Sequence, residues 1–179
     1  EAIDETHKIL KIYQDVVENF MGIPLTVGRK SNSEKFAGAV ETFSIEAMMG
    51  DKKALQAGTS HYLGQNFSKA FDVKFQDTDN TEKHVYATSW GVSTRLIGAL
   101  IMVHGDDKGL RLPPKIAPIQ IVIVPIFKTE EDLKKLLEYV HPILKHMDDN
   151  NISCYFDERN KLSPGFKFNE WEMKGVPLR

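Results

Sequence analysis

An arginine that opens an apolar helix is the residue of this chain whose position says most about chemistry. Residues 85–90 alternate as in a half-buried strand, and Gly91 ends that alternation. Arg95 follows within the turn, and the apolar segment 96–103 predicts a helix that ends at His104. We expect most sides of this helix to be buried, so that Arg95 either binds an anion such as ATP or pairs with a carboxylate. The pattern alone does not decide between these two roles.

The neighbours Ser60 and His61 have the types of a nucleophile and its base, but their spacing argues against that role. Adjacent side chains on an extended chain point to opposite faces, so no hydrogen bond can join them there. Thr59 and His61 share a face if the strand persists, and both could then reach one ligand. Thr59 and His61 are therefore candidate binding residues.

The common nucleotide and metal signatures do not occur in the sequence. There is no G-x-x-x-x-G-K-[ST] loop, no G-x-G-x-x-G after a strand, no H-E-x-x-H and no paired C-x-x-C. His104, Asp106 and Asp107 could hold a divalent ion, but a helix end followed by a polar loop explains them equally well. Because this group lacks the ligand number of a protein-built site, we expect no metal site in the chain.

The elements that must position these residues predict an α+β fold in the first part of the chain. Strand candidates follow strand candidates, which is typical of an antiparallel sheet and not of a doubly wound one. The expected elements are an amphipathic helix at 2–20, a strand at 25–27, a strand pair at 42–49 and 54–57 that Gly58 interrupts, a short helix at 61–71, and a second strand pair at 73–76 and 84–89.

A different pattern begins after Pro113 and Pro114, which predict a boundary between domains at 1–116 and 117–179. The second domain is expected to be a βαβ unit, because a continuous apolar run precedes a long amphipathic helix. Its elements are a strand at 119–124, a helix at 129–149 capped by Thr129 and Asp132, and a strand at 152–156.

The composition is that of a folded protein with no global preference for nucleic acid. Of 179 residues, 41% are hydrophobic and 27% charged, and the net charge is -2. The single cysteine, Cys154, can form neither an internal disulfide nor a cysteine-based zinc site, which fits a reducing compartment. No segment approaches the ~20 apolar residues of a membrane helix, so we expect no membrane contact.

Three separated segments carry a resemblance to a known family. They are KFAGA at 35–39, QAGTSHYLGQNFSKAF at 56–71 and SWGVSTRLIGALIMVHGDDKGLRLPP at 89–114. Together they resemble the prolyl-tRNA synthetases of the archaeal and eukaryotic type, which are class II aminoacyl-tRNA synthetases. The segment PGFKFNEWEMKGVPLR at 164–179 resembles the opening half of the anticodon-binding domain of that family. The resemblance thus implies part of a class II antiparallel catalytic core, followed by the first part of an α/β anticodon-binding domain.

The resemblance assigns roles to individual residues. Residues 85–105 would be motif 3 of the class, and Arg95 would contact the γ-phosphate of ATP and lie over the adenine. The other residues implied at ATP are Gln56, Thr59, Ser93 and Thr94, and those implied at proline are Phe36, His61, Ser89, Trp90 and Gly91. Because Gln56 and Thr59 would meet the same ATP, the strand should bend between them, and Gly58 would permit the bend.

In the resembling enzymes proline attacks the α-phosphorus of ATP, and the prolyl group then passes to tRNA(Pro). The resemblance therefore implies proline, ATP with Mg²⁺ and tRNA(Pro) as substrates, no zinc in this chain, a homodimeric parent and a cytoplasmic location. Such catalysis needs positioning and charge stabilisation, with no side-chain nucleophile. Motifs 1 and 2 of the class would precede Glu1, and they do not occur in this sequence. We thus expect a fragment of a proline-tRNA ligase that is inactive alone.

A second hypothesis is a tRNA anticodon-binding module or a non-catalytic synthetase-like fragment. Its surface would lie around Lys161, Lys167, Phe168, Trp171 and Lys174. Lys167 and Phe168 are the candidate RNA contacts, and Lys167→Glu should weaken tRNA binding by the parent. The alternative is an amphipathic helix with at least two of Phe166, Phe168 and Trp171 partly in the core.

Overall fold

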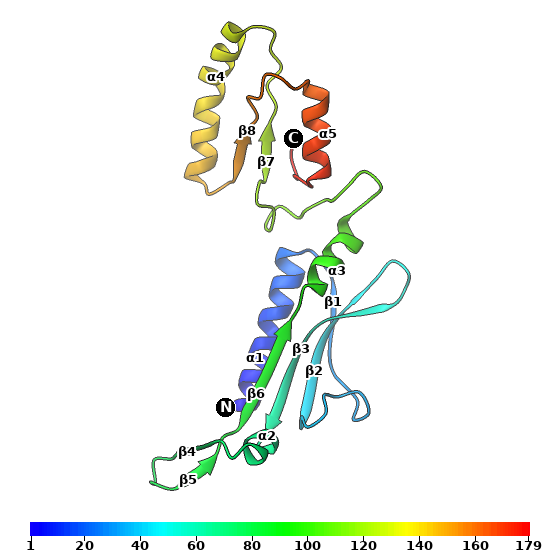
Figure 1. The fold of residues 1–179 in the computed structure, drawn as a ribbon, viewed down its shortest axis with the longest axis vertical. Coiled ribbons are helices and arrows are strands. Elements are labelled where there is room, and N and C mark those ends of the chain that lie inside the picture. The colour runs from blue at the N-terminus through cyan, green and yellow to red at the C-terminus, as the bar shows by residue number, and fades with distance from the viewer. The chain divides into compact units, whose positions relative to one another are not determined.

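The computed structural model describes residues 1–179, which form two compact units, Glu1–Val103 and His104–Arg179. The first unit is built on an antiparallel sheet, and the second on a parallel pair of strands (Figure 1). This mixture of helices with sheet agrees with the predicted α+β class.

A four-stranded antiparallel sheet in the order β1-β2-β3-β6 is the core of the first unit. One face of this sheet is covered by helix α1 (Figure 1). Ser60 Oγ donates a hydrogen bond to the main-chain oxygen of Thr6 at 2.8 Å, and the rings of His7 and Phe43 lie 4.5 Å apart. The elements are α1 (Ala2–Asp15), the π-helical turn η1 (Val16–Phe20), β1 (Leu25–Arg29), β2 (Glu41–Met48), β3 (Ala54–Gly64) and β6 (Ala87–Val92).

Strand β3 is longer than the sequence predicts, because it pairs on both sides. Residues 61–64 continue the strand, so the predicted helix at 61–71 is wrong over its first part, and α2 is confined to Asn66–Ala70. Gly58 does not interrupt the strand, since it pairs with Ile45 of β2 and Val92 of β6. The irregularity lies one residue earlier, where Ala57 has no partner between the pairs Ile45–Gly58 and Glu46–Gln56.

The second predicted strand pair is divided between two sheets. Strand β4 (Lys74–Gln76) pairs with β5 (Glu82–His84), whereas β6 joins the large sheet beside β3. Helix α3 (Arg95–His104) follows β6 as expected, but the expectation that most of its sides are buried is wrong. Ala99 and Leu100 are buried, whereas Ile97, Ile101 and Met102 are more than half exposed. Little of the chain packs against those apolar side chains.

The second unit is the predicted βαβ unit. Strands β7 (Ile121–Ile123) and β8 (Cys154–Phe156) are parallel, and α4 (Glu130–Asp149) connects them. Both hydrogen bonds of the predicted capping box between Thr129 and Asp132 are present. Helix α5 (Pro164–Met173) contributes Trp171 to a core with Val122 and Val176. None of the helices combines the length and apolar character required to span a bilayer.

Candidate active site

The strand register places a row of polar side chains on the sheet face that α1 does not cover. Residues directly opposite each other on paired strands share a face, and successive residues alternate between faces. Ser60 of β3 and Phe43 of β2 contact α1. The residues next to them in each strand therefore lie on the other side of the sheet, which we call the polar face. Its residues on β2, β3 and β6 are Thr42, Ser44, Glu46, Gln56, Thr59, His61, Ser89 and Gly91.

The unpaired residue in β3 brings two candidate ATP contacts onto this face. Gln56 and Thr59 are three positions apart and would face opposite ways in a regular strand. Gln56 pairs with Glu46 and Thr59 pairs with Ser44, and the Ser44 hydroxyl donates to the Glu46 carboxylate at 3.1 Å. The bulge at Ala57 thus restores a common face, which is the role that the sequence had assigned to Gly58.

Arg95 lies at one end of the polar face, next to Gln56. Its Nη1 donates a hydrogen bond to the main-chain oxygen of Gln56 at 3.1 Å, and its side chain is otherwise exposed. The hydroxyl of Ser93 accepts a hydrogen bond from the Arg95 amide at 3.3 Å, which fixes the turn before α3. The main-chain oxygen of Thr94 accepts a hydrogen bond from the amide of Ile97 in the same turn. A cation, a helix N-terminus and exposed hydroxyls therefore lie together, an arrangement suited to phosphate.

Phe36 and His61 meet at the other end of the polar face. Their ring centroids are 4.9 Å apart, and the Phe36 ring also stacks at 6.2 Å on Phe67 of α2. The Nδ1 atom of His61 is 3.0 Å from the hydroxyl of Thr42. Burial lowers the pKa of His61, so the neutral imidazole is favoured at neutral pH. The pair places one aromatic ring beside one polar ring at this end of the face.

Gly91 leaves space beside this row. It pairs with Thr59, and a Cβ built at Gly91 would meet no atom within 4 Å. The packing of the chain therefore does not require glycine at this position. Gly58 differs, because a Cβ there would lie 3.0 Å from Val92 and 3.3 Å from Ile45.

Trp90 is not brought together with the other residues implied at proline. It pairs with Ser60 and so lies on the α1 side of the sheet, whereas its neighbour Ser89 pairs with His61 on the polar face. The residues implied at proline that meet on the polar face are Phe36, His61, Ser89 and Gly91. Thr42, which sequence reasoning missed, joins Phe36 to His61. The alternation of Thr42 with Ser44 and Glu46 was the signal that could have found it.

Asp106, the first acidic residue after α3, is held by protein partners. The Asp106 carboxylate accepts from Arg111 Nε at 2.6 Å and from the amide of Lys108 at 2.9 Å, and these bonds lower its pKa. Across the chain, no group of three or more His, Cys, Asp or Glu side chains is placed to hold a metal ion.

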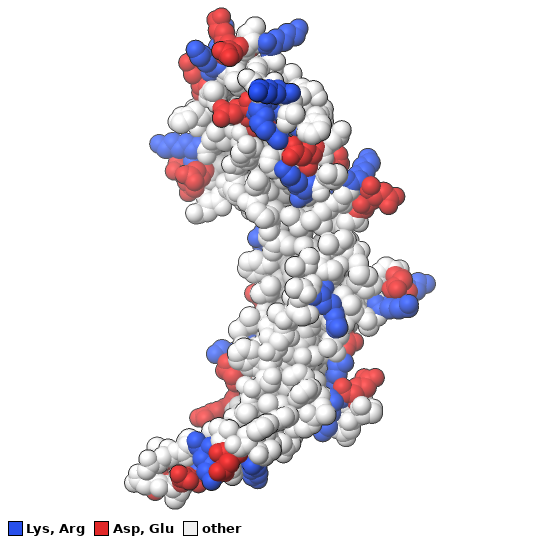
Figure 2. Space-filling view, viewed as in Figure 1, with Lys and Arg blue, Asp and Glu red and all other residues white.

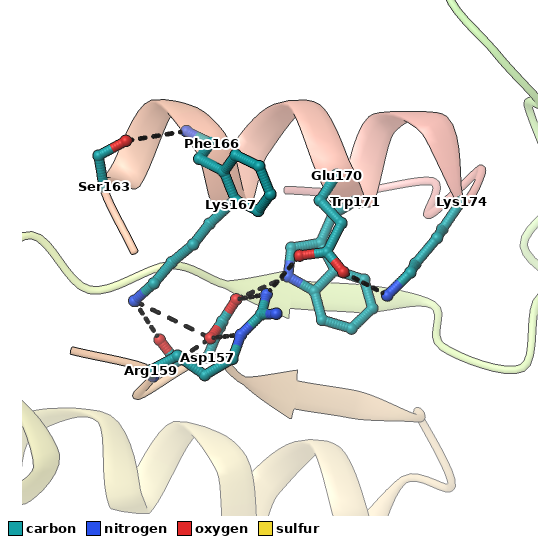
Figure 3. A network of polar contacts seen from close by, with 8 residues as sticks. All are labelled: Asp157, Arg159, Ser163, Phe166, Lys167, Glu170, Trp171 and Lys174. Atoms are coloured by element: carbon teal, nitrogen blue, oxygen red, sulfur yellow. Dashed lines mark hydrogen bonds and ion pairs between the residues drawn. The ribbon is translucent and has the colours of Figure 1, made fainter. Parts of the chain in front are cut away.

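The structure gives Lys167 a place inside the second unit. Its side chain is buried, and Nζ donates to the main-chain oxygen of Asp157 at 2.9 Å (Figure 3). An ammonium group in this position is not available to RNA, which argues against the predicted contact. The hydrophobic periodicity did not reveal this, because the partner Asp157 reaches Lys167 only through tertiary packing. Phe168 remains partly exposed, and among the three aromatic residues of α5 only Trp171 is buried.

Asp157 is the centre of that buried network. Its carboxylate accepts from Arg159 Nη2 at 2.6 Å and from the indole of Trp171 at 2.8 Å, and Arg159 also reaches Glu170 at 2.8 Å (Figure 3). Hydrogen bonding to Arg159, with help from Trp171, holds the pKa of Asp157 far below its usual range despite burial. The network fastens β8 to α5.

A groove at the start of α4 is lined in part by lysine side chains. The groove has a volume of about 640 Å³ and is lined by Lys128, Lys134, Lys161 and Asn160 among others. None of these lysines forms a salt bridge, whereas Lys174 is held by Glu170 at 2.7 Å. On the face shown in Figure 2, basic and acidic side chains are otherwise interspersed. An acidic polymer would thus find local sites here and no continuous basic surface.

Comparisons with known proteins agree with both units. A family model described as tRNA synthetase class II core domain (G, H, P, S and T) matches residues 1–104, and one described as anticodon binding domain matches residues 120–179. The proline–tRNA ligases of Flavobacterium psychrophilum and Cytophaga hutchinsonii are 58% and 59% identical to the chain over 179 residues, and that of Borreliella burgdorferi is 57% identical over 180.

These matches cover 100% of the chain but 36% or 37% of each relative. The chain therefore spans little more than a third of the length of these curated relatives. The match to the core model extends over more than half of the chain and ends where the first compact unit ends. This chain belongs to the class II tRNA synthetase core family, and its second unit belongs to the anticodon-binding domain family.

Proposed function

We propose that the chain is part of a proline-tRNA ligase and that ATP and proline bind side by side on the polar face of the first unit. The observation that carries the proposal is the shared face of Gln56, Thr59 and His61, beside Arg95. The sheet thus has a cationic end for phosphate and an aromatic end for a small ring. High identity to proline–tRNA ligases supports proline as the amino acid.

ATP would lie along Gln56, Thr59 and the turn at Ser93 and Thr94. The Arg95 guanidinium would stabilise the negative charge of the γ-phosphate, and Mg²⁺ would enter bound to ATP. When ATP binds, Arg95 would exchange its hydrogen bond with the main-chain oxygen of Gln56 for one with phosphate. A hydrogen bond to a charged acceptor is stronger than one to a neutral acceptor.

Proline would lie against Phe36 and His61, with Gly91 leaving room for its ring. The apolar ring of Phe36 suits the methylene groups of proline, and neutral His61 supplies a polar edge without adding positive charge. One carboxylate oxygen of proline attacks the α-phosphorus of ATP. The bond from that phosphorus to the bridging oxygen breaks, and pyrophosphate leaves. These side chains contribute positioning and charge stabilisation.

We further propose that the parent enzyme is homodimeric, acts in the cytoplasm and is of the archaeal and eukaryotic type. The relatives named above are bacterial, so the last proposal concerns the type of enzyme and not its source. The domain boundary is proposed at residues 116 and 117, in the segment that neither family model covers.

Thermal unfolding with a nonhydrolysable prolyl-adenylate analogue tests the site in the 179-residue chain. The analogue should raise the melting temperature of the first unit, since a ligand that binds only the folded state stabilises it. The Arg95→Ala chain is the matched control and should show a smaller shift. Equal shifts in both chains would contradict the proposed phosphate contact. We expect no proline-dependent pyrophosphate exchange by this chain alone, because no motif 2 arginine occurs in it.

A second candidate function, tRNA binding, is favoured by the groove at the start of α4. Three lysines without ion pairs line it, and phosphate contacts by such residues supply most of nonspecific RNA affinity. Transcribed tRNA(Pro), and not the adenylate analogue, should then raise the melting temperature of the second unit. Stabilisation by the analogue alone would leave only the first function.

A further inference from the structure

The hydroxyl group of Thr42 joins the two side chains that form the proposed proline pocket. Thr42 Oγ1 accepts a hydrogen bond from the amide of Phe36 at 3.0 Å and lies 3.0 Å from Nδ1 of His61. Thr42 is 1% exposed, so its hydroxyl does not reach a ligand itself. Thr42 Oγ1 thus contacts both residues of the proposed proline pocket.

The chemistry of its members favours one direction for this chain of hydrogen bonds. The Phe36 amide can only donate, so it uses one acceptor position of the Thr42 oxygen. The hydroxyl keeps one proton, and Nδ1 of His61 lies within its reach. A neutral imidazole that accepts at Nδ1 carries its proton on Nε2. The polar ring of the pocket then presents a hydrogen-bond donor.

We propose that Thr42 is a positioning residue, which sets both the tautomer of His61 and the place of the Phe36 backbone. The inference rests on the proposed function, because it needs proline to bind against these two residues. Thr42 acts through its neighbours, and it is not a catalytic residue.

The loop that carries Phe36 has two further ties, one to strand β3 and one to helix α2. The amide of Val40 donates to the Tyr62 oxygen at 2.9 Å, and Asn66 Nδ2 donates to the Gly38 oxygen at 2.9 Å. These bonds hold the loop without involving His61. Loss of the Thr42 hydroxyl should therefore shift the histidine tautomer and loosen the Phe36 backbone while the sheet persists.

Nitrogen NMR of the 179-residue chain tests the positioning directly and requires no substrate. In the unaltered chain, the His61 spectrum should show a protonated Nε2 and an unprotonated Nδ1. Thr42→Val keeps the shape of the side chain but removes the hydroxyl, and it should give a mixture of tautomers. Thr42→Ser keeps the hydroxyl and should restore the single tautomer. A protonated Nδ1 in the unaltered chain, or the same spectrum in Thr42→Val, would overturn the inference.

Kinetics of the full-length protein test the consequence for proline. We expect Thr42→Val to raise the KM for proline about tenfold, as for the loss of one well-placed hydrogen bond, with the KM for ATP little changed. Thr42→Ser should recover most of that loss. A KM for proline that Thr42→Val leaves unchanged, or equal increases for proline and ATP, would indicate a structural role only and overturn the inference. If the expected NMR result is obtained but the unaltered enzyme shows no proline-dependent exchange, the proposed function fails while the hold of Thr42 on His61 stands.

Discussion

Arg95 and Gln56 are joined by a hydrogen bond of 3.1 Å from the guanidinium Nη1 to a main-chain oxygen, although 39 positions separate them in sequence. The contact places the guanidinium beside strand β3, next to Gln56, whose side chain lies on the polar face. This hydrogen bond holds the guanidinium near the polar face, and no carboxylate neutralises its charge. Pairing of Arg95 with a carboxylate was the other role that the sequence allowed. No salt bridge of Arg95 occurs in the structure, so its charge is available to an anion.

Gly91→Val should abolish ligand binding without loss of stability. Nothing in the chain lies within 4 Å of a Cβ at this position, and β-branched residues suit strands. We expect the free energy of unfolding to change by less than about 1 kcal/mol. The KM for proline of the full-length protein should rise strongly, because the new side chain would occupy the space beside Thr59. Gly98→Ala in α3, where the space is also open, is the control and should leave KM unchanged. Normal proline kinetics in Gly91→Val would place the ligand elsewhere.

His61 should make the first unit less stable as the pH falls below about 6.5, the usual pKa of the unfolded side chain. Burial lowers the pKa of His61 in the folded state, so the unfolded state binds more protons at acidic pH. The stability that the neutral ring contributes is present above pH 6.5 and is lost as the pH falls through the folded pKa. Urea unfolding between pH 5 and 8 measures this, and His61→Asn should show a flatter profile. An identical profile in both chains would contradict the pKa direction.

Asp157→Ala should destabilise the second unit by about 3 kcal/mol or more, because it removes the negative charge beside the buried Lys167 and the acceptor of the Trp171 indole. Lys174→Ala removes a partly exposed ion pair with Glu170 at the end of α5 and should cost less than about 1 kcal/mol. Chemical denaturation followed by Trp171 fluorescence compares the two variants. Similar midpoints would mean that the network adds little to stability.

Because of the Asp157 carboxylate, we expect the free energy of unfolding of the second unit to fall in acid. The folded pKa of Asp157 is depressed, so its contribution is present above the unfolded value of about 3.9 and is lost as the pH falls toward the folded pKa. Unfolding of the second unit should therefore become easier below pH 4. The slope should be smaller in Asp157→Asn, and an equal slope would assign this loss of stability to other groups.

Lys161→Glu should weaken tRNA binding by the full-length protein, whereas Lys167→Glu should unfold the second unit. Lys161 lines the groove and is exposed, but Lys167 is buried against Asp157. Loss of one phosphate contact should reduce the slope of log affinity against log salt by about one. Lys145→Glu, an exposed site farther along α4, makes the same charge change and serves as the control. If Lys145→Glu weakens binding as much as Lys161→Glu, the groove is not the tRNA site.

Local signals predicted the elements whose stabilising contacts are close in sequence. Helix α4 was predicted with its cap, because Thr129 and Asp132 are three positions apart. The structure has both hydrogen bonds of this capping box. The continuous apolar run before this helix correctly indicated a parallel strand, although only Val122 of β7 is fully buried. Such features depend on side chains that meet whatever the rest of the chain does.

Contacts between distant segments were not predictable in the same way. The extension of β3 through His61 depends on β6, and the common face of Gln56 and Thr59 depends on an unpaired Ala57 that no local pattern marks. Lys167 has the type of a surface residue, and only the path of β8 brings Asp157 to it. The resemblance supplied the identities of the candidate ligand contacts, and the register decided which of them lie together.

Proline-dependent exchange of pyrophosphate into ATP by the full-length protein is the measurement that tests the central claim most directly. We predict exchange with proline and not with other amino acids, and a loss of at least about 100-fold in Arg95→Ala, as for removal of a charge-stabilising group. The Arg95→Ala protein should unfold at the same temperature as the unaltered protein, since Arg95 is exposed. No exchange with proline, or full exchange in Arg95→Ala, would contradict the assignment of ATP and proline to the polar face.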